Sequence, residues 1–260
     1  MKKSTNTSKI NSKITDKLIL PISFIVIILV WEGLVYILKT PEYLVPAPSA
    51  VLDALIEYFP LLMRHTLVTC VEVILGFTAA LVLSIIISLL MVRVKILYKI
   101  LWPYMVISQT VPLYVLAPLF MIWFGFGILP KILIVALVCF FPITVGLVQG
   151  LTSTEPELDE LLEVMRATPS QILWKVRIPQ AMPQFFSGLK IAAAYSVTGA
   201  VLAEWVGAQE GLGIFLTRAM KTYNTAAVFA DVLIVIVLSL LLFFAISFIE
   251  KKVIRRRHLS

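Results

Sequence analysis

The chain has 260 residues, of which 60% are hydrophobic and only 14% are charged. A water-soluble domain of this length has no need of so little charge, so the composition favours a membrane protein. The formal net charge of +7 comes from Lys and Arg residues that cluster at the chain ends and in short segments between apolar runs. That placement is the orientation signal of a membrane protein, and it argues against a nucleic-acid partner.

Six apolar runs are long enough to cross about 30 Å of hydrocarbon as α-helices, which satisfy their own backbone hydrogen bonds in lipid. The runs cover residues 18–38, 67–91, 101–124, 129–150, 185–207 and 228–249. They lack the alternation of a transmembrane β-barrel. The predicted fold class is an all-α membrane protein with six transmembrane helices. These helices form one domain over residues 18–250, between tails at 1–17 and 251–260.

Some segments carry finer signals. Residues 48–60 place their apolar side chains on one helical face, which predicts a helix lying at the outer interface, with Ser49 as its N-cap. In the third run, Pro112 and Pro118 are expected to interrupt backbone hydrogen bonds and kink the helix. Residues 207–227 begin with glycines and are too short and polar to span.

Lys and Arg are concentrated in the two tails, around residues 92–100 and in the polar stretch 152–184. The positive-inside rule therefore predicts a multi-pass protein with both termini and residues 152–184 in the cytoplasm.

The polar stretch 152–184, between the fourth and fifth spans, has the pattern of two short amphipathic helices. Thr154 and Glu157 have the spacing of a capping box. A second box follows at Thr168, with Pro169 in the first helical position and Gln171 at N3, and Pro179 is expected to end this second helix. The two helices predict either an ordinary surface loop or, because the caps lie back to back, a rigid protrusion that docks a partner.

The same stretch resembles the EAA loop, the cytoplasmic coupling loop of ABC importer permeases. The family pattern is E-A-A, three residues, Gly, nine residues, Ile, one residue and Leu-Pro. Residues 160–162 match E-A-A as Glu-Leu-Leu, and 178–179 match Leu-Pro as Ile-Pro. Arg166 stands at the Gly position, where a left-handed backbone would cost about 1 kcal/mol. The turn could instead bend differently, or Arg166 could contact the partner.

This resemblance implies a fold like that of type I ABC importer permeases, with a cytoplasmic coupling helix pair between spans 4 and 5. It also implies a role in coupling to an ATPase for Glu160, Leu161, Leu162, Glu163, Arg166, Ala167, Thr168, Pro169, Ile178 and Pro179.

The segments WEGLVYI, VPAPSAVLDAL and SGLKIAAAYSVTGAVLAEW resemble the nitrate/sulfonate/taurine-type branch of these permeases. Within the branch, SGLKIAAAYSVTGAVLAEW is most similar to members assigned to pyrimidine thiamine precursors. The resemblance implies ATP-driven import of a small solute across the cell inner membrane by alternating access. It also implies three kinds of partner: two ATP-binding ABC subunits, an extracytoplasmic solute-binding protein and a second permease copy.

The sequence contains no G-x-x-x-x-G-K-[ST] motif and no catalytic or metal-ligand constellation. We therefore expect no enzyme activity and no cofactor or metal in this chain, with ATP and Mg²⁺ held by the partner ATPase. An ion-coupled secondary transporter and a non-catalytic membrane assembly protein remain as alternatives.

Polar residues inside the spans are costly in lipid. Glu32, Glu72 and Glu204 lie toward span ends, where interfacial snorkelling explains them most simply. A second group lies deeper and forms either helix–helix hydrogen bonds or the lining of a substrate path. Its members are Gln109, Thr110, Tyr195, Ser196 and Thr198.

Overall fold

The computed structural model describes residues 5–153, 162 and 164–257, and the secondary structure of these residues is helical. The described helices are α1 (Thr5–Leu38), α2 (Pro48–Glu57), α3 (Phe59–Arg93), α4 (Lys95–Ser108), α5 (Leu113–Phe124), α6 (Ile128–Thr152), α8 (Pro169–Ile172), the π-helix η1 (Leu173–Arg177), α9 (Ile178–Glu204), α10 (Leu212–Lys221) and α11 (Thr225–Arg257). The chain divides into two compact units, residues 1–60 with 218–231 and residues 61–217 with 232–260.

In the smaller unit, hydrogen bonds to the carboxylate of Glu32 join α1 to the start of α2. Glu32 accepts hydrogen bonds from the backbone N–H of Ser49 at 3.0 Å and from its hydroxyl at 2.7 Å. The expectation that Ser49 caps its own helix is therefore wrong. Ala47 is the N-cap and Pro48 occupies the first turn, where its missing N–H costs nothing. Glu32 is held by a specific partner.

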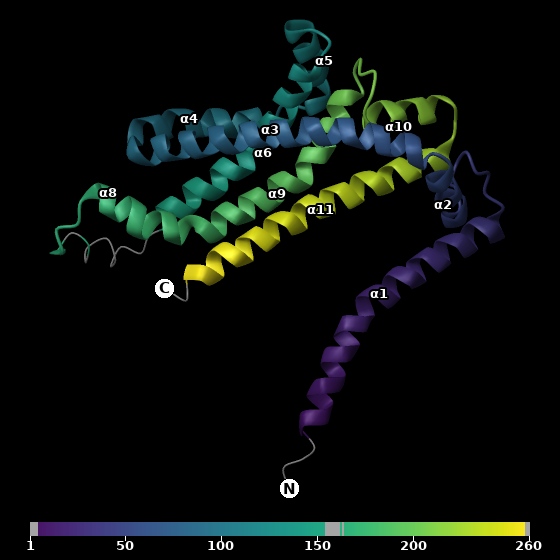
Figure 1. The fold of residues 1–260 in the computed structure, drawn as a ribbon, viewed down its shortest axis with the longest axis horizontal. Helices are drawn as coiled ribbons and strands as arrows, with labels where there is room; N and C mark the ends of the chain where they lie inside the picture. The colour runs from purple at the N-terminus through teal and green to yellow at the C-terminus, as the bar shows by residue number, and fades with distance from the viewer. Residues whose placement is uncertain (1–4, 154–161, 163, 258–260) are drawn as a thin grey trace. The chain divides into compact units, whose positions relative to one another are not determined.

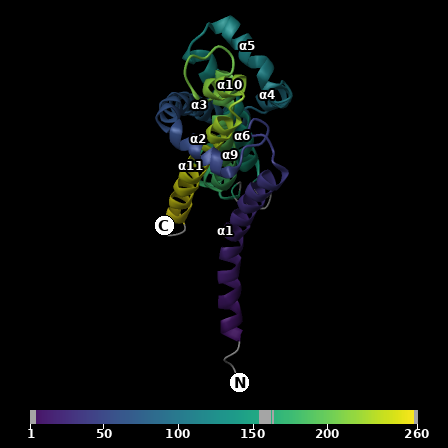
Figure 2. The same ribbon diagram turned by 90° about the vertical axis from the view of Figure 1, so that its right-hand side faces the viewer.

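The larger unit is built on the contact between α6 and α9, which lie side by side in both views (Figures 1 and 2). Glycines bring the two backbones together. A methyl group at Gly146 would lie 2.6 Å from the carbonyl oxygen of Gln184, and one at Gly188 would collide with the carbonyl oxygen of Pro142. Small residues allow this approach, and close packing replaces the hydrophobic driving force that lipid cannot supply.

Helix α3 packs on α6 through hydroxyl groups. Ser84 donates a hydrogen bond to the carbonyl oxygen of Phe140 at 3.0 Å, and Ser88 donates to that of Thr144 at 3.4 Å. Both serines are fully buried. Interhelical hydrogen bonds of this kind stabilise membrane bundles where no water competes for the donor.

Five described helices are long and apolar enough to span a membrane, and a sixth span results if α4 and α5 count as one broken pair. The predicted third span, 101–124, is not a continuous helix: α4 and α5 meet at a bend of 103°, which Figures 1 and 2 both display. The break falls at residues 109–112, because Pro112 lacks an N–H and disfavours helix in the residue before it. Pro118 lies inside α5 without ending it.

Pro179 does not end the coupling helix, contrary to expectation. Residues 169–204 run as one helical segment through α8, η1 and α9, so the fifth span begins well before residue 185. In η1 the Ile178 N–H bonds to the Leu173 carbonyl, five residues earlier. This wider turn reduces the clash between a proline ring and the preceding helical turn, so Pro179 fits at the start of α9.

The α6–α9 contact generates a stability prediction. Gly188→Ala places a methyl group against the Pro142 carbonyl oxygen, so we expect a loss of about 1–3 kcal/mol. Gly199→Ala is the matched control on α9, because its new methyl group would lie 3.4 Å from Val138, an ordinary contact. Thermal unfolding in detergent measures the difference. Equal melting temperatures for the two variants would contradict the assigned close approach.

Candidate functional site

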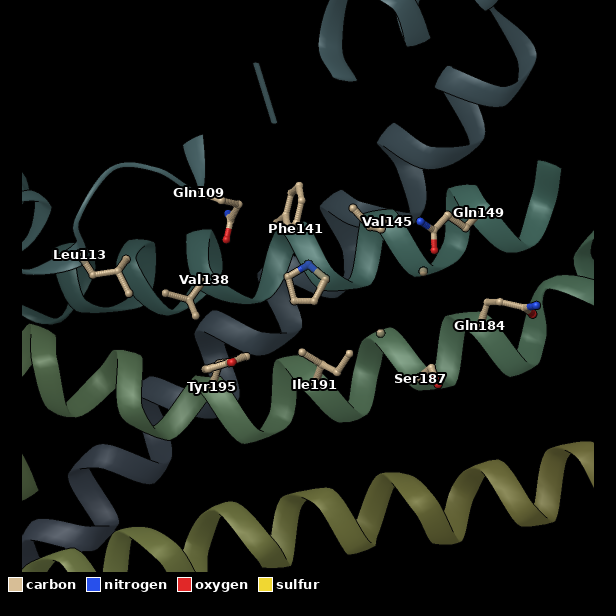
Figure 3. Close-up of a pocket in the computed structure, with 13 residues that line it drawn as sticks. Gln109, Leu113, Val138, Phe141, Val145, Gln149, Gln184, Ser187, Ile191 and Tyr195 are labelled. Atoms are coloured by element: carbon tan, nitrogen blue, oxygen red, sulfur yellow. The ribbon is translucent and has the colours of Figure 1, made fainter. Parts of the chain in front are cut away.

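The larger unit contains a pocket of about 530 Å³ along α6 and α9, shown in Figure 3. Its lining residues are all uncharged: Gln109, Leu113, Val138, Phe141, Pro142, Val145, Gly146, Gln149, Gln184, Ser187, Gly188, Ile191 and Tyr195. The size is typical of a small-molecule site.

Polar groups lie at the two ends of this pocket, and its middle is apolar. In Figure 3, Gln109 and Tyr195 lie toward one end, while Gln149, Gln184 and Ser187 lie toward the other. The ring of Phe141 and the side chains of Val145 and Ile191 lie between them. The arrangement suits a small molecule with an apolar or aromatic body and hydrogen-bonding groups at both ends.

Helical periodicity explains how these residues gather. On α9 the lining positions are 184, 187, 188, 191 and 195, which repeat every three or four residues and so share one face. Positions 138, 141, 142, 145 and 149 of α6 follow the same spacing. Gln109 also lines the pocket because the helix is interrupted before Pro112, so that residues 109–112 leave the axis of α4.

The structure places the five predicted path residues differently. Gln109 and Tyr195 line the pocket, but Thr110, Ser196 and Thr198 are not among its lining residues. Thr110 bonds to the Ile107 carbonyl at 2.7 Å, and the buried Ser196 hydroxyl bonds to that of Ala193 at 2.8 Å, so both make contacts within their own segments. Thr198 is exposed on α9, three residues beyond Tyr195.

Sequence reasoning missed Gln149, Gln184 and Ser187. A signal was present, because two amides and a hydroxyl at the inner ends of apolar runs are costly in lipid. On α9 the exposed positions include Gln184, Ser187, Tyr195 and Thr198. By contrast, the exposed residues between positions 232 and 249 of α11 are all apolar: Val232, Leu233, Ile236, Val237, Leu240, Leu241, Phe244, Ala245, Phe248 and Ile249. The α9 face therefore suits water or protein, and the α11 face suits lipid.

A second polar cluster is buried at the end of α9 where α10 begins. His65, Thr69 and Glu72 lie on one face of α3, and each is 3% exposed or less. Glu204, at the end of α9, accepts a hydrogen bond from the Thr69 hydroxyl at 2.7 Å and one from the Gly213 N–H at 2.6 Å. The cluster thus ties α3, α9 and α10 together.

This enclosed cluster also caps α10. The Gly211 N–H donates to His65 Nδ1 at 2.9 Å, and the Leu212 N–H donates to the Thr69 hydroxyl at 3.0 Å. These N–H groups have no partner within the helix, so buried acceptors are needed. Gly211 has φ of +123°, and a side chain there would meet the Glu204 carboxylate, so glycine is required.

Glu72 completes the cluster through α6, since its carboxylate accepts a hydrogen bond from Lys131 Nζ at 2.6 Å. Lys131 is itself only 8% exposed. The interpretation of Glu72 and Glu204 as snorkelling side chains is therefore wrong. Their partners lie 59 and 135 residues away in sequence, which local pattern cannot reveal.

The coupling segment is described in part. Glu160, Leu161 and Glu163, and the first predicted capping box at 154–157, lie outside the described residues. Arg166 has φ of +54°, and the Ala167 N–H bonds to the Leu162 carbonyl at 3.0 Å. This is the geometry of a Schellman helix end with Arg166 at the position that usually holds glycine. The backbone is therefore left-handed at this position in spite of the arginine.

The second capping box is present. The Thr168 hydroxyl accepts from the Gln171 N–H at 3.3 Å, and the Gln171 side chain accepts from the Thr168 N–H at 2.9 Å. Pro169 is exposed, as are Arg166 and Thr168. Behind them, Leu173 and Ile178 pack against the cluster of Leu147, Leu151 and Ala181. An exposed capped turn is thus fixed to the C-terminal end of α6 and the N-terminal end of α9.

Comparison with known proteins agrees with this architecture. Residues 72–255 match the family described as binding-protein-dependent transport system inner membrane component. A probable ABC transporter permease protein of Haemophilus influenzae is 36% identical over 224 residues, covering 86% of this chain and 91% of the relative. The formylaminopyrimidine transport permease protein ThiX of Halalkalibacterium halodurans is 36% identical over 228 residues, covering 87% and 91%.

The fold is similar to a chain of the MetNI methionine ABC transporter in an inward-facing conformation, with a TM-score of 0.66. That match has 22% sequence identity and covers 76% of this chain and 98% of the other, so it shows the fold alone. The chain belongs to the family of binding-protein-dependent transport system inner membrane components. It is a multi-pass permease subunit of an ABC importer for small solutes.

The enclosed cluster predicts a large effect of single substitutions. Lys131→Met leaves Glu72 buried without its cation, so we expect a loss of about 3–5 kcal/mol in stability. The double variant Lys131→Met with Glu72→Leu removes both charges and should recover most of that loss. Thermal unfolding of Lys131→Met, Glu72→Leu and the double variant in detergent gives the coupling free energy. Additive losses in the double variant would show that the two side chains do not depend on one another.

The left-handed arginine predicts a contrast between two substitutions. Arg166→Gly relieves the strained backbone, and Arg166→Ala keeps it, while both remove the guanidinium group. The glycine variant should be more stable than the alanine variant by about 1 kcal/mol. If the alanine and glycine variants melt at the same temperature, residue 166 is not left-handed in solution.

Proposed function

We propose that two copies of this chain enclose a solute path between their α9 faces and that the pocket on α6 and α9 belongs to this path. The observation that carries the proposal is the polar, exposed face of α9 with Gln184, Ser187 and Tyr195. A lipid-facing helix would hold such groups only at a cost, whereas a second subunit and a water-filled path would accommodate them.

Coupling to an ATPase would act through the exposed turn at residues 166–169. The helix that begins at this turn continues into α9, which carries the pocket, so a push on the turn reaches the path without crossing a flexible loop. The π-helix η1 is the one irregular element in this described run, and such elements often mark hinges. Glu160, Leu161, Leu162 and Glu163 would extend the docking surface in front of the turn.

The remaining partners follow from this arrangement. Two ATP-binding ABC subunits would dock on the cytoplasmic side, hold ATP and Mg²⁺, and drive alternating access between inward-open and outward-open states. An extracytoplasmic solute-binding protein would deliver the solute at the opposite side. The Lys and Arg residues of 92–100, 152–184 and both tails support a cytoplasmic location for the termini and the coupling turn.

The solute we favour is a pyrimidine precursor of thiamine. The ThiX relative is a formylaminopyrimidine transport permease protein, and the pocket is lined by uncharged residues. A sulfonate, taurine or nitrate comes next, but an anion is most strongly held by Arg or Lys, and neither lines the pocket.

An ion-coupled secondary transporter would need carboxylates that can change partners inside the membrane. Three carboxylates are buried in the described residues, Glu72, Glu204 and Asp231, and they meet part of that requirement. Glu72 and Glu204 are engaged, by Lys131 and by the capped start of α10 respectively, in an arrangement that suits a structural tie. Together with the family membership, this favours an ATP-driven importer.

Reconstitution tests the proposed function. Proteoliposomes containing this permease and its ATPase should accumulate labelled formylaminopyrimidine against a gradient when ATP and the binding protein are supplied. A nonhydrolysable ATP analogue should abolish accumulation, and so should omission of the ATPase. Uphill uptake by the permease alone, driven by an ion gradient, would refute the proposal. Accumulation of labelled taurine in place of the pyrimidine would refute its substrate.

A further inference from the structure

We propose that the pocket between α6 and α9 binds the solute during its passage, and that Gln149 and Gln184 select neutral, planar molecules. The inference rests on the proposed function, because it concerns the same path. It goes further because it assigns part of the solute selectivity to the permease itself, and not only to the solute-binding protein.

The two glutamines are free to hold a ligand. Both side chains are exposed, and within the described residues neither side-chain amide takes part in a hydrogen bond inside the protein. The polar side chains of Thr144 and Ser196 behave differently, since each bonds to a carbonyl of its own helix. An amide that stays unpaired among apolar helices is costly in lipid, and a hydrogen-bonding solute would satisfy it.

The chemistry of the inner end of the pocket suits a heterocycle. Each amide offers an N–H donor and a carbonyl acceptor, and the Ser187 hydroxyl can do both. Figure 3 shows these three groups toward one end of the pocket, with Gln149 on α6 and with Gln184 and Ser187 on α9. A ring nitrogen flanked by an amino group presents an acceptor beside a donor, which is the complement of such an amide.

The middle of the pocket suits the flat body of such a molecule. Phe141, Val145 and Ile191 line it, and an aromatic ring packs favourably on the face or edge of another. Toward the other end, Gln109 and Tyr195 can bond a second polar substituent. A carboxylate or sulfonate placed here would lose its hydration without gaining a cation, so the pocket disfavours anions.

Direct binding provides the test, with labelled formylaminopyrimidine and the purified permease–ATPase complex in nanodiscs, without the solute-binding protein. Gln149→Leu and Gln184→Leu should each weaken binding by about tenfold, the effect of one lost hydrogen bond. Gln180→Leu is the matched control: it is the same change on an exposed residue of α9, one turn from Gln184 and outside the lining of the pocket. It should bind as the wild type does.

The leucine variants should fold, because both glutamines are exposed and neither substitution opens a cavity in the packed helices. Gel filtration checks this, and the two variants lie on different helices, so one failure of assembly leaves the other informative. Binding that is equal in the wild type, the two variants and the control would overturn the inference. So would binding absent from a wild-type complex that imports the solute with ATP. A wild-type complex that imports nothing would instead count against the proposed function.

Discussion

The approach of α6 to α9 through glycine is the constraint on which the larger unit depends. Gly146 and Gly188 bring the two backbones so close that a methyl group at either position would meet a carbonyl oxygen. Two helices held at this distance present a shared groove, because the lining side chains of both lie along it. The pocket follows from that geometry, and its polarity follows from the residues at the neighbouring turns.

The same pair of helices determines how a movement at the inner end of α9 would be transmitted. Leu173 and Ile178 pack on Leu147, Leu151 and Ala181, so the base of the coupling turn is anchored to both α6 and α9. At the other end of α9, Glu204 is tied to α3 and to the start of α10. A helix fixed at both ends moves as a body or bends at its weakest turn, and η1 provides a turn with longer-range hydrogen bonds.

The features predictable from sequence are those that depend on neighbouring residues. Apolar runs predicted the spans, Pro112 marked the break in the third, and Thr168 with Gln171 marked a helix start that is present. At Arg166 the sequence left two alternatives, a left-handed backbone or a different bend, and the structure has the left-handed one. The prediction that Pro179 ends a helix was wrong because a proline ordinarily does so. No local pattern in the sequence indicated that a π-helical turn would accommodate the proline ring. The prediction that Glu72 and Glu204 snorkel to the interface was wrong because Lys131 and Thr69, their partners, are distant in sequence.

The polar residues of the bundle separate according to where their partners lie. Thr144 and Ser196 donate their hydroxyl protons to a carbonyl of their own helix, and both are fully buried, so they are not open to another molecule. Glu72, Lys131 and Glu204 bond across helices and are closed off from solvent, so they hold the fold. Gln149, Gln184 and Ser187 lie exposed along one pocket. Position in an apolar run does not distinguish these groups, since each carries a cost in lipid, whereas the route by which each polar atom is satisfied does. The residues that remain for the solute are those whose hydrogen-bonding capacity the protein has left unused.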